Sequence, residues 1–388
     1  MSAPLTSESL SVPYNGLEEI KEGLPAAWYY DPSHYERELA RIWRRTWIYL
    51  CRSSEVAERR AYLTFSLAGQ QVMLVRDDEG VLRGFHNTCR HRGSALCLEP
   101  RGVLRSPALV CPYHAWSYSL KGDLLRTSSR TLPAGFSNAD YPLYPVKVEE
   151  WRGFIFVTLA EDPPTLEEAL DFKTGRLERW PLEDLVVAHV DTRIIDCNWK
   201  VFWENFSECL HCPGIHPSLC QLVPLFGRGY IRERDDPNWQ QHAQDPNPLY
   251  RGGLRDGAET WSTDGQPSAP VFPGLSEQDR QLGQVYLTSL PSVFIAAHVD
   301  YVRSVRLWPL GPEKMELRAE YLFSPQALAS PDFNLKKVVD FAGLVMGEDA
   351  RVCEINQRGL RALPHRAGVL MPEEYMVHSF HNWIRARL

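Results

Sequence analysis

Residues 89–114 read CRHRGSALCLEPRGVLRSPALVCPYH and decide the fold of the first half of the chain. They hold two short segments with one cysteine and one histidine each: Cys89 with His91, then Cys111 with His114 after 19 intervening residues. Two loops that each offer a thiolate and an imidazole can close on one metal centre. The alternative, buried thiols beside structural histidines, is the weaker interpretation for two such matching segments.

The order of the cysteines and histidines distinguishes between two kinds of metal centre that these four residues could form. Two cysteines and two histidines are a standard tetrahedral zinc set, but the usual zinc finger groups the cysteines before the histidines. Here the two types alternate. Alternation suits a 2Fe–2S cluster of the Rieske type, because one iron takes both cysteines and the other takes both histidines.

The sequence around this stretch is β-rich from residue 45 to residue 160. Short runs of strand-forming residues, separated by turns with glycine and aspartate, predict a small antiparallel β domain; the runs are AYLTFSL, QVMLVRD, ALVCPYHAW and GFIFVTL. Before it, residues 1–44 predict a loose lead-in and a helix, PSHYERELARIWRRTW, which we expect to pack on the C-terminal domain.

Residues 161–388 predict a second domain of mixed structure. EDPPTLEEAL indicates a linker that enters a helix, and a further helix is expected around 198–212. Residues 224–276 are rich in Pro, Gly and Asp and predict loops, whereas SVFIAAHVDYVRSVRLWPLG and KMELRAEYLFSP predict antiparallel strands. One long helix is expected over 332–361. The fold class predicted is therefore α+β, a β domain placed before, or inserted into, a helix-and-antiparallel-sheet domain.

Composition excludes several classes of protein. The 388 residues are 44% hydrophobic and 23% charged, which is typical of a soluble globular protein, and the net charge of −7 argues against nucleic-acid binding. No apolar run is long enough for a membrane span, and the N-terminus does not resemble a secretory signal, so a cytoplasmic protein with its nine cysteines as thiols or metal ligands is expected. The chain has no GxGxxG motif after a strand, so we expect it to bind neither NAD(P)H nor FAD itself.

A second group of ligand residues lies in residues 198–216, NWKVFWENFSECLHCPGIH. Aromatic residues at helical spacing predict one buried face, whereas Glu204, Glu208 and His211 share another face. Pro213 and the glycine after it break the helix, so that His216 can turn back towards His211. Two converging histidines can bind a metal, and a carboxylate would complete a facial triad with open positions for oxygen.

The carboxylate and the metal are both open to alternatives at this point. Cys209 and Cys212 could join the histidines in a zinc site, although the helix would have to unwind. Asp349 interrupts the apolar stripe of the long C-terminal helix, and a buried acid there must be paired or bind a metal. A kink at Gly347 that leaves Asp349 in water is equally consistent with the pattern.

Both groups together resemble one family. NTCRHRGSAL and LVCPYHAWSYSLKGDL resemble the two cluster loops of ring-hydroxylating oxygenases, while NWK…EN…ECLHCPGIHP and GEDARVCEINQRGL resemble their catalytic iron motif. The resemblance implies a Rieske domain (45–160) before a helix-grip, START-like catalytic domain (161–388). It also implies one mononuclear Fe(II) and one 2Fe–2S cluster per chain. The implied roles are cluster ligands Cys89, His91, Cys111 and His114, iron ligands His211, His216 and Asp349, electron-transfer bridge Glu208, and Asn205 beside the iron.

Two departures narrow the resemblance. The bridging acid is Glu208 where most of the family has aspartate, and its spacing from Asn205 is one residue shorter. Both features resemble the branch that oxidises quaternary ammonium compounds such as choline, glycine betaine, carnitine and stachydrine. The resemblance implies O2 as co-substrate, electrons from a separate flavin and iron–sulfur NAD(P)H reductase, and a homotrimer in which Glu208 passes electrons from a neighbouring subunit's cluster.

The expected function is therefore that of a terminal oxygenase that hydroxylates or N-demethylates a small quaternary or tertiary amine. An aromatic cage could hold the cation, with Trp203, Phe206, Trp308 and Tyr321 as pocket candidates. The close alternative is an aromatic carboxylate substrate, which Arg303 and Arg306 could pair. A Rieske electron carrier without oxygenase activity and a zinc-binding scaffold are alternatives of other classes.

Overall fold

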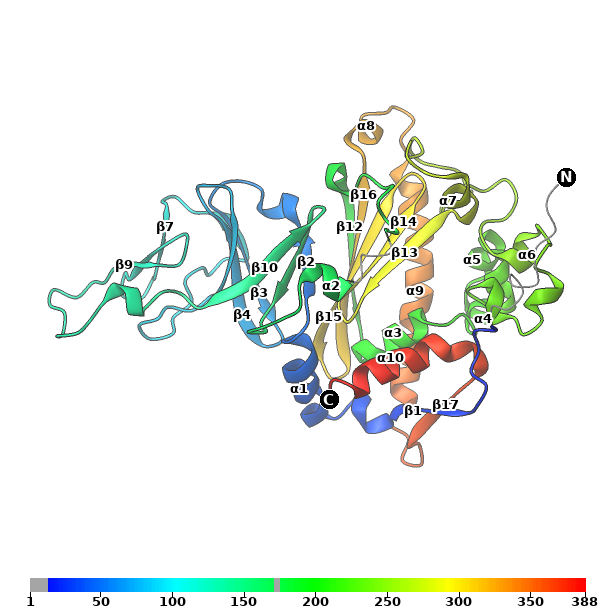
Figure 1. Ribbon diagram of the computed structural model, residues 1–388, viewed down its shortest axis with the longest axis horizontal. Coiled ribbons are helices and arrows are strands. Elements are labelled where there is room, and N and C mark those ends of the chain that lie inside the picture. The colour runs from blue at the N-terminus through cyan, green and yellow to red at the C-terminus, as the bar shows by residue number, and fades with distance from the viewer. Residues whose placement is uncertain (1–12, 171–174) are drawn as a thin grey trace. The chain divides into compact units, whose positions relative to one another are not determined.

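The computed structural model describes residues 13–170 and 175–388 (Figure 1). The start of the expected N-terminal lead-in therefore lies outside the described residues. The described chain divides into two compact units. One takes residues 38–170 and 289–292, and the other takes residues 13–37, 175–288 and 293–388.

The first unit is the predicted antiparallel β domain. Seven strands form one sheet in the order β2-β11-β10-β5-β4-β3-β6, and three more form a small sheet, β7-β8-β9. The bounds are β2 Ile48–Arg52, β3 Ala61–Leu67, β4 Gln70–Arg76, β5 Leu82–His86, β6 Arg101–Val103, β7 Ala108–Val110, β8 Ser117–Ser119, β9 Leu124–Arg126, β10 Pro145–Trp151 and β11 Phe154–Thr158. Helix α2, Leu166–Leu170, follows as expected from EDPPTLEEAL.

The core of this unit lies beneath the two cluster loops. Cys89 and Cys111 are buried together with Phe85, Tyr118 and Leu143 in one apolar cluster. The runs predicted as strands are strands, but ALVCPYHAW is extended only over Ala108–Val110 before it turns. The strand ends there because Cys111 and the residues after it form a loop and do not pair with a neighbouring strand.

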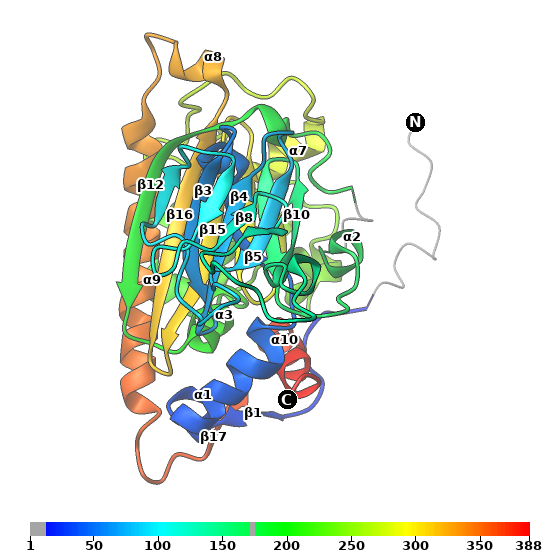
Figure 2. The same cartoon turned by 90° about the vertical axis from the view of Figure 1, so that its left-hand side faces the viewer.

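The second unit combines a five-stranded antiparallel sheet, in the order β12-β16-β15-β14-β13, with helices (Figures 1 and 2). Its strands are β12 Val186–Ile195, β13 Gln284–Ser289, β14 Val293–His298, β15 Val302–Gly311 and β16 Lys314–Phe323; β1 Lys21–Pro25 and β17 Ala367–Leu370 pair separately. Its helices are α1 Pro32–Glu38, α3 Trp199–Phe206, α4 Cys212–Ile215, α5 Pro217–Leu222, α6 Pro248–Arg251, α7 Glu277–Leu282, α8 Pro325–Leu328, α9 Leu335–Gly359 and α10 Tyr375–Arg385. The α+β class is confirmed.

Helix α9 is the long helix predicted over 332–361, and it is continuous through Gly347. Its buried stripe includes Val338, Phe341 and Val345, which follow the 3.6-residue period of a helix that packs along one face. Gln357 at its end accepts a hydrogen bond from the backbone N–H of Asn198 at 2.9 Å. This bond ties the start of α3 to α9 and thereby brings the two ligand-bearing segments together.

Residues 224–276 consist mainly of loops, as predicted. They contain short 3-10 helices over Pro224–Arg228, Glu233–Asp235 and Trp239–Gln241 together with α6. None of the described helices has the length and apolar character that crossing a membrane requires.

Candidate functional site

The first ligand-bearing segment folds differently from the single helix expected over 198–212. Helix α3 begins after Asn198, whose side chain accepts from the backbone N–H of Lys200, and it ends at Phe206. The carboxylate of Glu208 then accepts hydrogen bonds from the backbone N–H groups of Leu210 and His211. A side-chain acceptor for free backbone donors favours a turn over a continuing helix, so the chain reverses before α4 starts. Pro213 lies in the first turn of α4 and does not break a longer helix.

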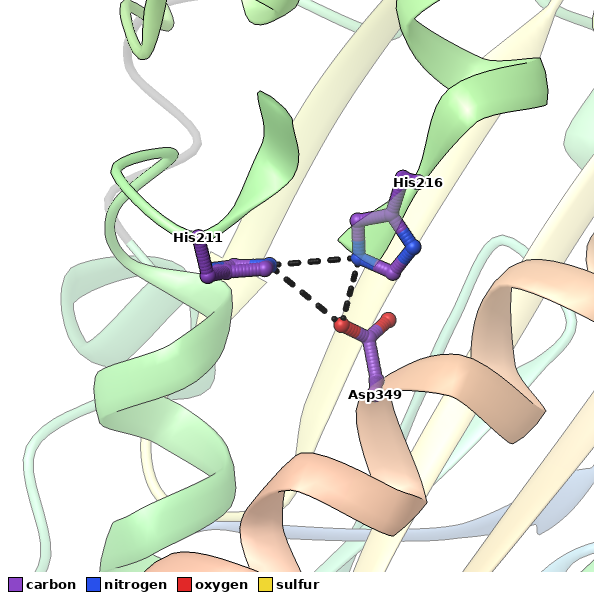
Figure 3. Close-up of side chains that lie close together, drawn as sticks. All are labelled: His211, His216 and Asp349. Carbon is purple, nitrogen blue, oxygen red and sulfur yellow. Dashed lines mark hydrogen bonds and ion pairs between the residues drawn. The ribbon is translucent and has the colours of Figure 1, made fainter. Parts of the chain in front are cut away.

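The turn brings three predicted ligand residues together (Figure 3). The Nε2 atoms of His211 and His216 are 3.2 Å apart, and Oδ1 of Asp349 is 3.5 Å and 3.0 Å from them. His211 comes from the turn before α4, His216 from the junction between α4 and α5, and Asp349 from α9. Three donor atoms that all lie within 4.8 Å of one another could serve as a facial set for one metal ion.

Each histidine also has a glutamate at its other ring nitrogen. Glu208 lies 2.6 Å from Nδ1 of His211, and Glu348 lies 2.7 Å from Nδ1 of His216. A carboxylate at Nδ1 accepts its proton and leaves Nε2 free to bind a metal. Glu348 was not expected from the sequence. Its position directly before Asp349 was the available signal, since consecutive acids on a helix point in different directions and can serve two partners.

The electrostatics of the three residues fit a cation at their centre. Burial lowers the pKa of His211, but Asp349 and Glu208 outweigh burial and raise it to about 9. For Asp349 the effects have the opposite sign: burial raises its pKa, but the two histidines have the larger effect and lower it. The carboxylates therefore stabilise positive charge on the imidazoles, which a divalent metal ion supplies in place of protons.

Asn205 and Glu204 lie beside this centre on α3. Nδ2 of Asn205 is 3.3 Å from Nε2 of His211, so the asparagine occupies the place that the family resemblance implies. Glu204 does not point at the metal site. It accepts from the hydroxyl of Tyr29 at 2.5 Å and lies 2.8 Å from Nε2 of His381. A cavity of about 390 Å³ opens here and is lined by Glu204, Asn205, Glu208 and His211 among others.

The two cysteines around His211 are bonded to each other. Cys209 and Cys212 form a disulfide, which corrects the expectation that the cysteines are either thiols or metal ligands. Three residues of separation at a tight turn place their Cα atoms 5.0 Å apart, within the range that a disulfide spans. Sulfurs bonded to each other are not thiolate ligands, so the structure does not support the zinc alternative at this segment.

The second predicted centre lies in two loops of the β domain that have the same turn. The backbone N–H of Gly93 bonds the carbonyl of Cys89, and that of Ala115 bonds the carbonyl of Cys111. The fourth residue after each cysteine has a left-handed backbone conformation, with φ of 77° for Gly93 and 55° for Ala115. Each loop thus folds back over its cysteine and carries its histidine outward.

The donor atoms separate into a buried pair and an outer pair. Cys89 and Cys111 are 3% and 2% exposed and interact with each other, whereas the rings of His91 and His114 meet edge to face with centroids 4.8 Å apart. Burial raises the pKa of the Cys111 thiol, but the backbone N–H groups of Tyr113 and His114 outweigh it and lower that pKa. Two adjacent sulfurs beneath two adjacent imidazoles fit a 2Fe–2S cluster with one cysteine-bound and one histidine-bound iron.

Aromatic residues support this second centre. The hydroxyl of Tyr118 lies 3.2 Å from Sγ of Cys89 and accepts from the backbone N–H of Arg90. The indole of Trp116 stacks on His91 at a centroid distance of 4.8 Å. Trp116 therefore covers one face of the ring of a proposed cluster ligand.

The four residues predicted to line a substrate pocket do not all meet. Trp203 and Phe206 pack against each other on α3, and both contact Phe294 of β14. Tyr321 of β16 lies opposite Arg303 of β15, on the same face of the sheet. Trp308 lies five residues beyond Arg303 on β15, so alternation places it on the opposite face, under the guanidinium of Arg306. The structure therefore separates Trp308 from the other three.

Comparison with protein families identifies both units. Residues 173–388 match the model of the catalytic domain of ring-hydroxylating alpha subunits, and residues 46–134 match the Rieske [2Fe-2S] domain. The glycine betaine monooxygenase oxygenase subunit of Chromohalobacter salexigens is 30% identical over 93% of this chain and 84% of its own length. The carnitine monooxygenase oxygenase subunit of Escherichia coli K12 is 34% identical over 92% of each chain.

Solved structures show the same fold. A quaternary ammonium Rieske monooxygenase studied for carnitine oxidation and inter-subunit electron transfer superposes with a TM-score of 0.71 at 22% identity, covering 95% of this chain and 96% of its own. Naphthalene 1,2-dioxygenase from Rhodococcus sp. gives a TM-score of 0.67 at 23% identity, covering 94% of each chain.

The two centres and these matches define the class of protein: the chain belongs to the alpha subunits of the Rieske-type ring-hydroxylating oxygenases. It is an oxidoreductase, the oxygenase component of a system that uses O2 and a separate reductase, with a 2Fe–2S cluster and a mononuclear iron as cofactors.

Proposed function

We propose that this oxygenase hydroxylates or N-demethylates a small quaternary or tertiary amine. The observation that carries the proposal is Glu208 on Nδ1 of His211, at the position and spacing that the sequence shares with the quaternary ammonium branch. The relatives named for glycine betaine, choline and carnitine support it, since they align along more than nine tenths of this chain.

His211, His216 and Asp349 are the proposed iron ligands, and Cys89, His91, Cys111 and His114 the proposed cluster ligands. An iron ion held by these three residues would supply the activation of O2. The protein residues then have separable tasks. Glu208 and Glu348 hold the two imidazoles with Nε2 facing inward, and Asn205 places an amide beside His211. Phe206 and Phe294 cover the adjoining face of the sheet with apolar surface, which excludes water.

Glu208 is also the proposed bridge between subunits. One oxygen contacts His211, and the residue is among those that line the cavity of about 390 Å³. The cavity provides one side from which a histidine of a neighbouring subunit's cluster loop could approach Glu208. We therefore propose a homotrimer in which each Glu208 connects His211 to a neighbour's cluster, and a cytoplasmic location, where NAD(P)H supplies the reductase.

The test is reductase-driven O2 uptake by the purified oxygenase with a panel of substrates. The panel contains glycine betaine, carnitine, choline and stachydrine on one side, and benzoate-type aromatic carboxylates on the other. Uptake coupled to release of formaldehyde or of a hydroxylated amine is expected for at least one amine. Coupled turnover of an aromatic carboxylate, with no amine above background, would favour the aromatic alternative and contradict the proposal.

A further inference from the structure

Arg303 stands in a row of residues that crosses the five-stranded sheet. It is opposite Ala296 of β14 and Tyr321 of β16, and Tyr321 is opposite His189 of β12. Partners directly opposite each other in an antiparallel sheet point to the same face. Phe294 and His298, two residues to either side of Ala296, share that face too.

The guanidinium of Arg303 is buried without an opposite charge. The residue is 5% exposed, its Nε has no hydrogen-bond partner, and no carboxylate among the described residues pairs with it. The nearest acid along the chain, Asp300, is engaged by Thr260 and by the backbone N–H of Ser268. An unpaired buried charge is strongly unfavourable, so natural proteins rarely keep one without a function.

The groups around Arg303 are neutral. The phenols of Tyr321, Tyr286 and Tyr301 lie near it, and burial raises the pKa of each, for Tyr286 to about 12. The hydroxyl of Tyr301 donates to the backbone carbonyl of Trp261 at 3.0 Å. Burial, with the charge of Arg303, holds the pKa of His298 well below its usual value. Both ring nitrogens of His298 and the hydroxyl of Tyr321 are buried without a hydrogen bond of ordinary geometry among the described residues, although Tyr321 lies close to the guanidinium and His298 lies close to the backbone of Gly283. One fixed positive charge therefore lies among neutral polar groups.

The other arginines on these two strands behave differently. Arg306 lies 2.7 Å from Glu316, and Arg318 lies 3.1 Å from Glu320. Both project from the face opposite to that of Arg303, because each is an odd number of residues from Arg303 or from its partner Tyr321. The strands thus supply a carboxylate for each arginine of that face and none for Arg303.

The face that carries Arg303 also borders the iron site. Phe294 stacks on Phe206 of α3 at 4.2 Å and contacts Trp203, and α3 leads into the turn that holds His211. Tyr286 packs on Phe206, and the charges of Asp349 and Arg303 act on its pKa in opposite directions. Tyr286 therefore lies within electrostatic range of one proposed iron ligand and of the guanidinium.

We propose that Arg303, with Tyr321 and His298 as neutral hydrogen-bonding partners, binds a carboxylate group of the substrate. The inference rests on the proposed function and deepens it. The amine then carries a carboxylate as well as the ammonium group, so the substrate is a zwitterionic ammonium carboxylate and not a purely cationic amino alcohol. A guanidinium binds a carboxylate through two parallel hydrogen bonds, which also fixes the distance of the oxidised methyl group from the iron.

The experiment measures binding to the metal-loaded oxygenase by titration calorimetry, without reductase. The probes are glycine betaine, carnitine and stachydrine, each with its methyl ester, which keeps the ammonium group and removes the negative charge. At least one acid should bind about tenfold more tightly than its ester or better, because the ester loses a charge-assisted pair. Arg303→Gln should abolish this preference, and Arg303→Lys should restore part of it. Arg306→Gln, on the same strand but the opposite face, is the matched control and should keep it.

The outcomes separate this inference from the proposed function. An ester that binds as tightly as its acid overturns the role of Arg303, even if the amines drive O2 uptake and the proposed function stands. If no amine binds but a benzoate-type acid binds and depends on Arg303, the carboxylate site stands and the amine proposal fails. The acid–ester comparison in the wild-type protein needs no variant, so a misfolded Arg303→Gln protein leaves the test intact.

Discussion

At the scale of single residues, the proposed metal site is organised by two glutamates as much as by its three proposed ligands. Glu208 and Glu348 occupy Nδ1 of His211 and His216, and Asp349 contacts both Nε2 atoms. Each ring is therefore held in an orientation that turns Nε2 towards the centre of the three residues. Carboxylates in this position typically account for 10- to 100-fold in metal affinity.

Replacing Glu348 by glutamine should weaken iron binding about 10- to 100-fold while the cluster remains. The amide keeps the volume of the side chain, but its weaker hydrogen bond holds His216 less firmly. Iron affinity is measured by competition with a chelator, and the visible spectrum reports the cluster. Glu354→Gln, on the same helix but bonded to the backbone of Asp196, is the control and should bind iron as the wild type does. Equal affinities in all three proteins would contradict the role of Glu348.

Replacing Asp349 by alanine should lower the iron content from three to two per chain. The cluster ligands lie in the other unit, so its two irons and its visible spectrum should persist. Iron and acid-labile sulfide assays measure both quantities on one sample. A variant that keeps three irons would remove Asp349 from the ligand set.

The proposed cysteine and histidine ligands could be picked out from the sequence because spacing and residue type indicate them, whereas Asp349 is assigned only through the family resemblance. The surroundings of these residues could not be predicted. The pattern of 198–212 is helical, but the Glu208 carboxylate competes for backbone N–H groups and ends α3 at Phe206. Strand alternation places Trp308 on the face of the sheet opposite to Arg303, but this follows only once the bounds of β15 are known. Whether Arg303 has a carboxylate partner depends on which strands lie beside β15, and no local sequence pattern contains that information.

At the scale of elements, helix α7 fixes the entry to β13, the strand that carries Tyr286. Ser276 caps the helix by accepting from the backbone N–H of Asp279, and Asp279 accepts in return from the backbone N–H of Ser276. Arg179 donates two hydrogen bonds to the same carboxylate, at 2.6 Å and 2.8 Å. One buried acid thus joins a cap, a helix and a distant loop.

Asp279→Asn should destabilise the protein by about 2 kcal/mol at neutral pH. Burial raises the pKa of Asp279, but hydrogen bonds from Arg179 and Ser276 outweigh it and lower the pKa from 3.8 to about 2. A lowered folded-state pKa stabilises the fold above the unfolded pKa, so the contribution is complete at neutral pH and is lost as the pH falls from about 4 to about 2.

Urea unfolding followed by circular dichroism measures this difference. The gap in unfolding free energy between the wild type and Asp279→Asn should be constant above about pH 5 and shrink below pH 4. Glu277→Gln, in the exposed first turn of the same helix, should change stability by less than about 0.5 kcal/mol. A gap that does not depend on pH would exclude the carboxylate charge as its cause.

At the scale of the whole molecule, the two metal centres belong to units with separate cores. The cluster loops rest on the apolar cluster that includes Phe85, Tyr118 and Leu143, while the iron ligands join α9 to the segment after α3. Loss of one centre should therefore leave the other intact. This separation makes the proposed electron path between subunits testable.

The Cys111→Ser protein and the Asp349→Ala protein should each be inactive alone, but oligomers that contain both kinds of chain should be active. Co-expression of the two chains with different tags yields mixed oligomers in which one subunit's intact cluster neighbours another's intact iron. In a ring that mixes equal amounts at random, about a quarter of the sites combine both centres across an interface. Coupled O2 uptake measures the recovery, and homo-oligomers mixed after purification are the control. Mixed oligomers as inactive as each parent would exclude transfer between subunits.

The bond between Cys209 and Cys212 has a consequence for how this protein is handled in the laboratory. Seven cysteines are free, so the denatured, cluster-free chain should alkylate at seven positions before reduction and at nine afterwards. A thiol reductant added to protect the other cysteines also opens the small ring that encloses Leu210 and His211. Batches prepared with and without reductant are therefore chemically distinct next to a proposed iron ligand, and their activities are comparable only when the alkylation count is the same.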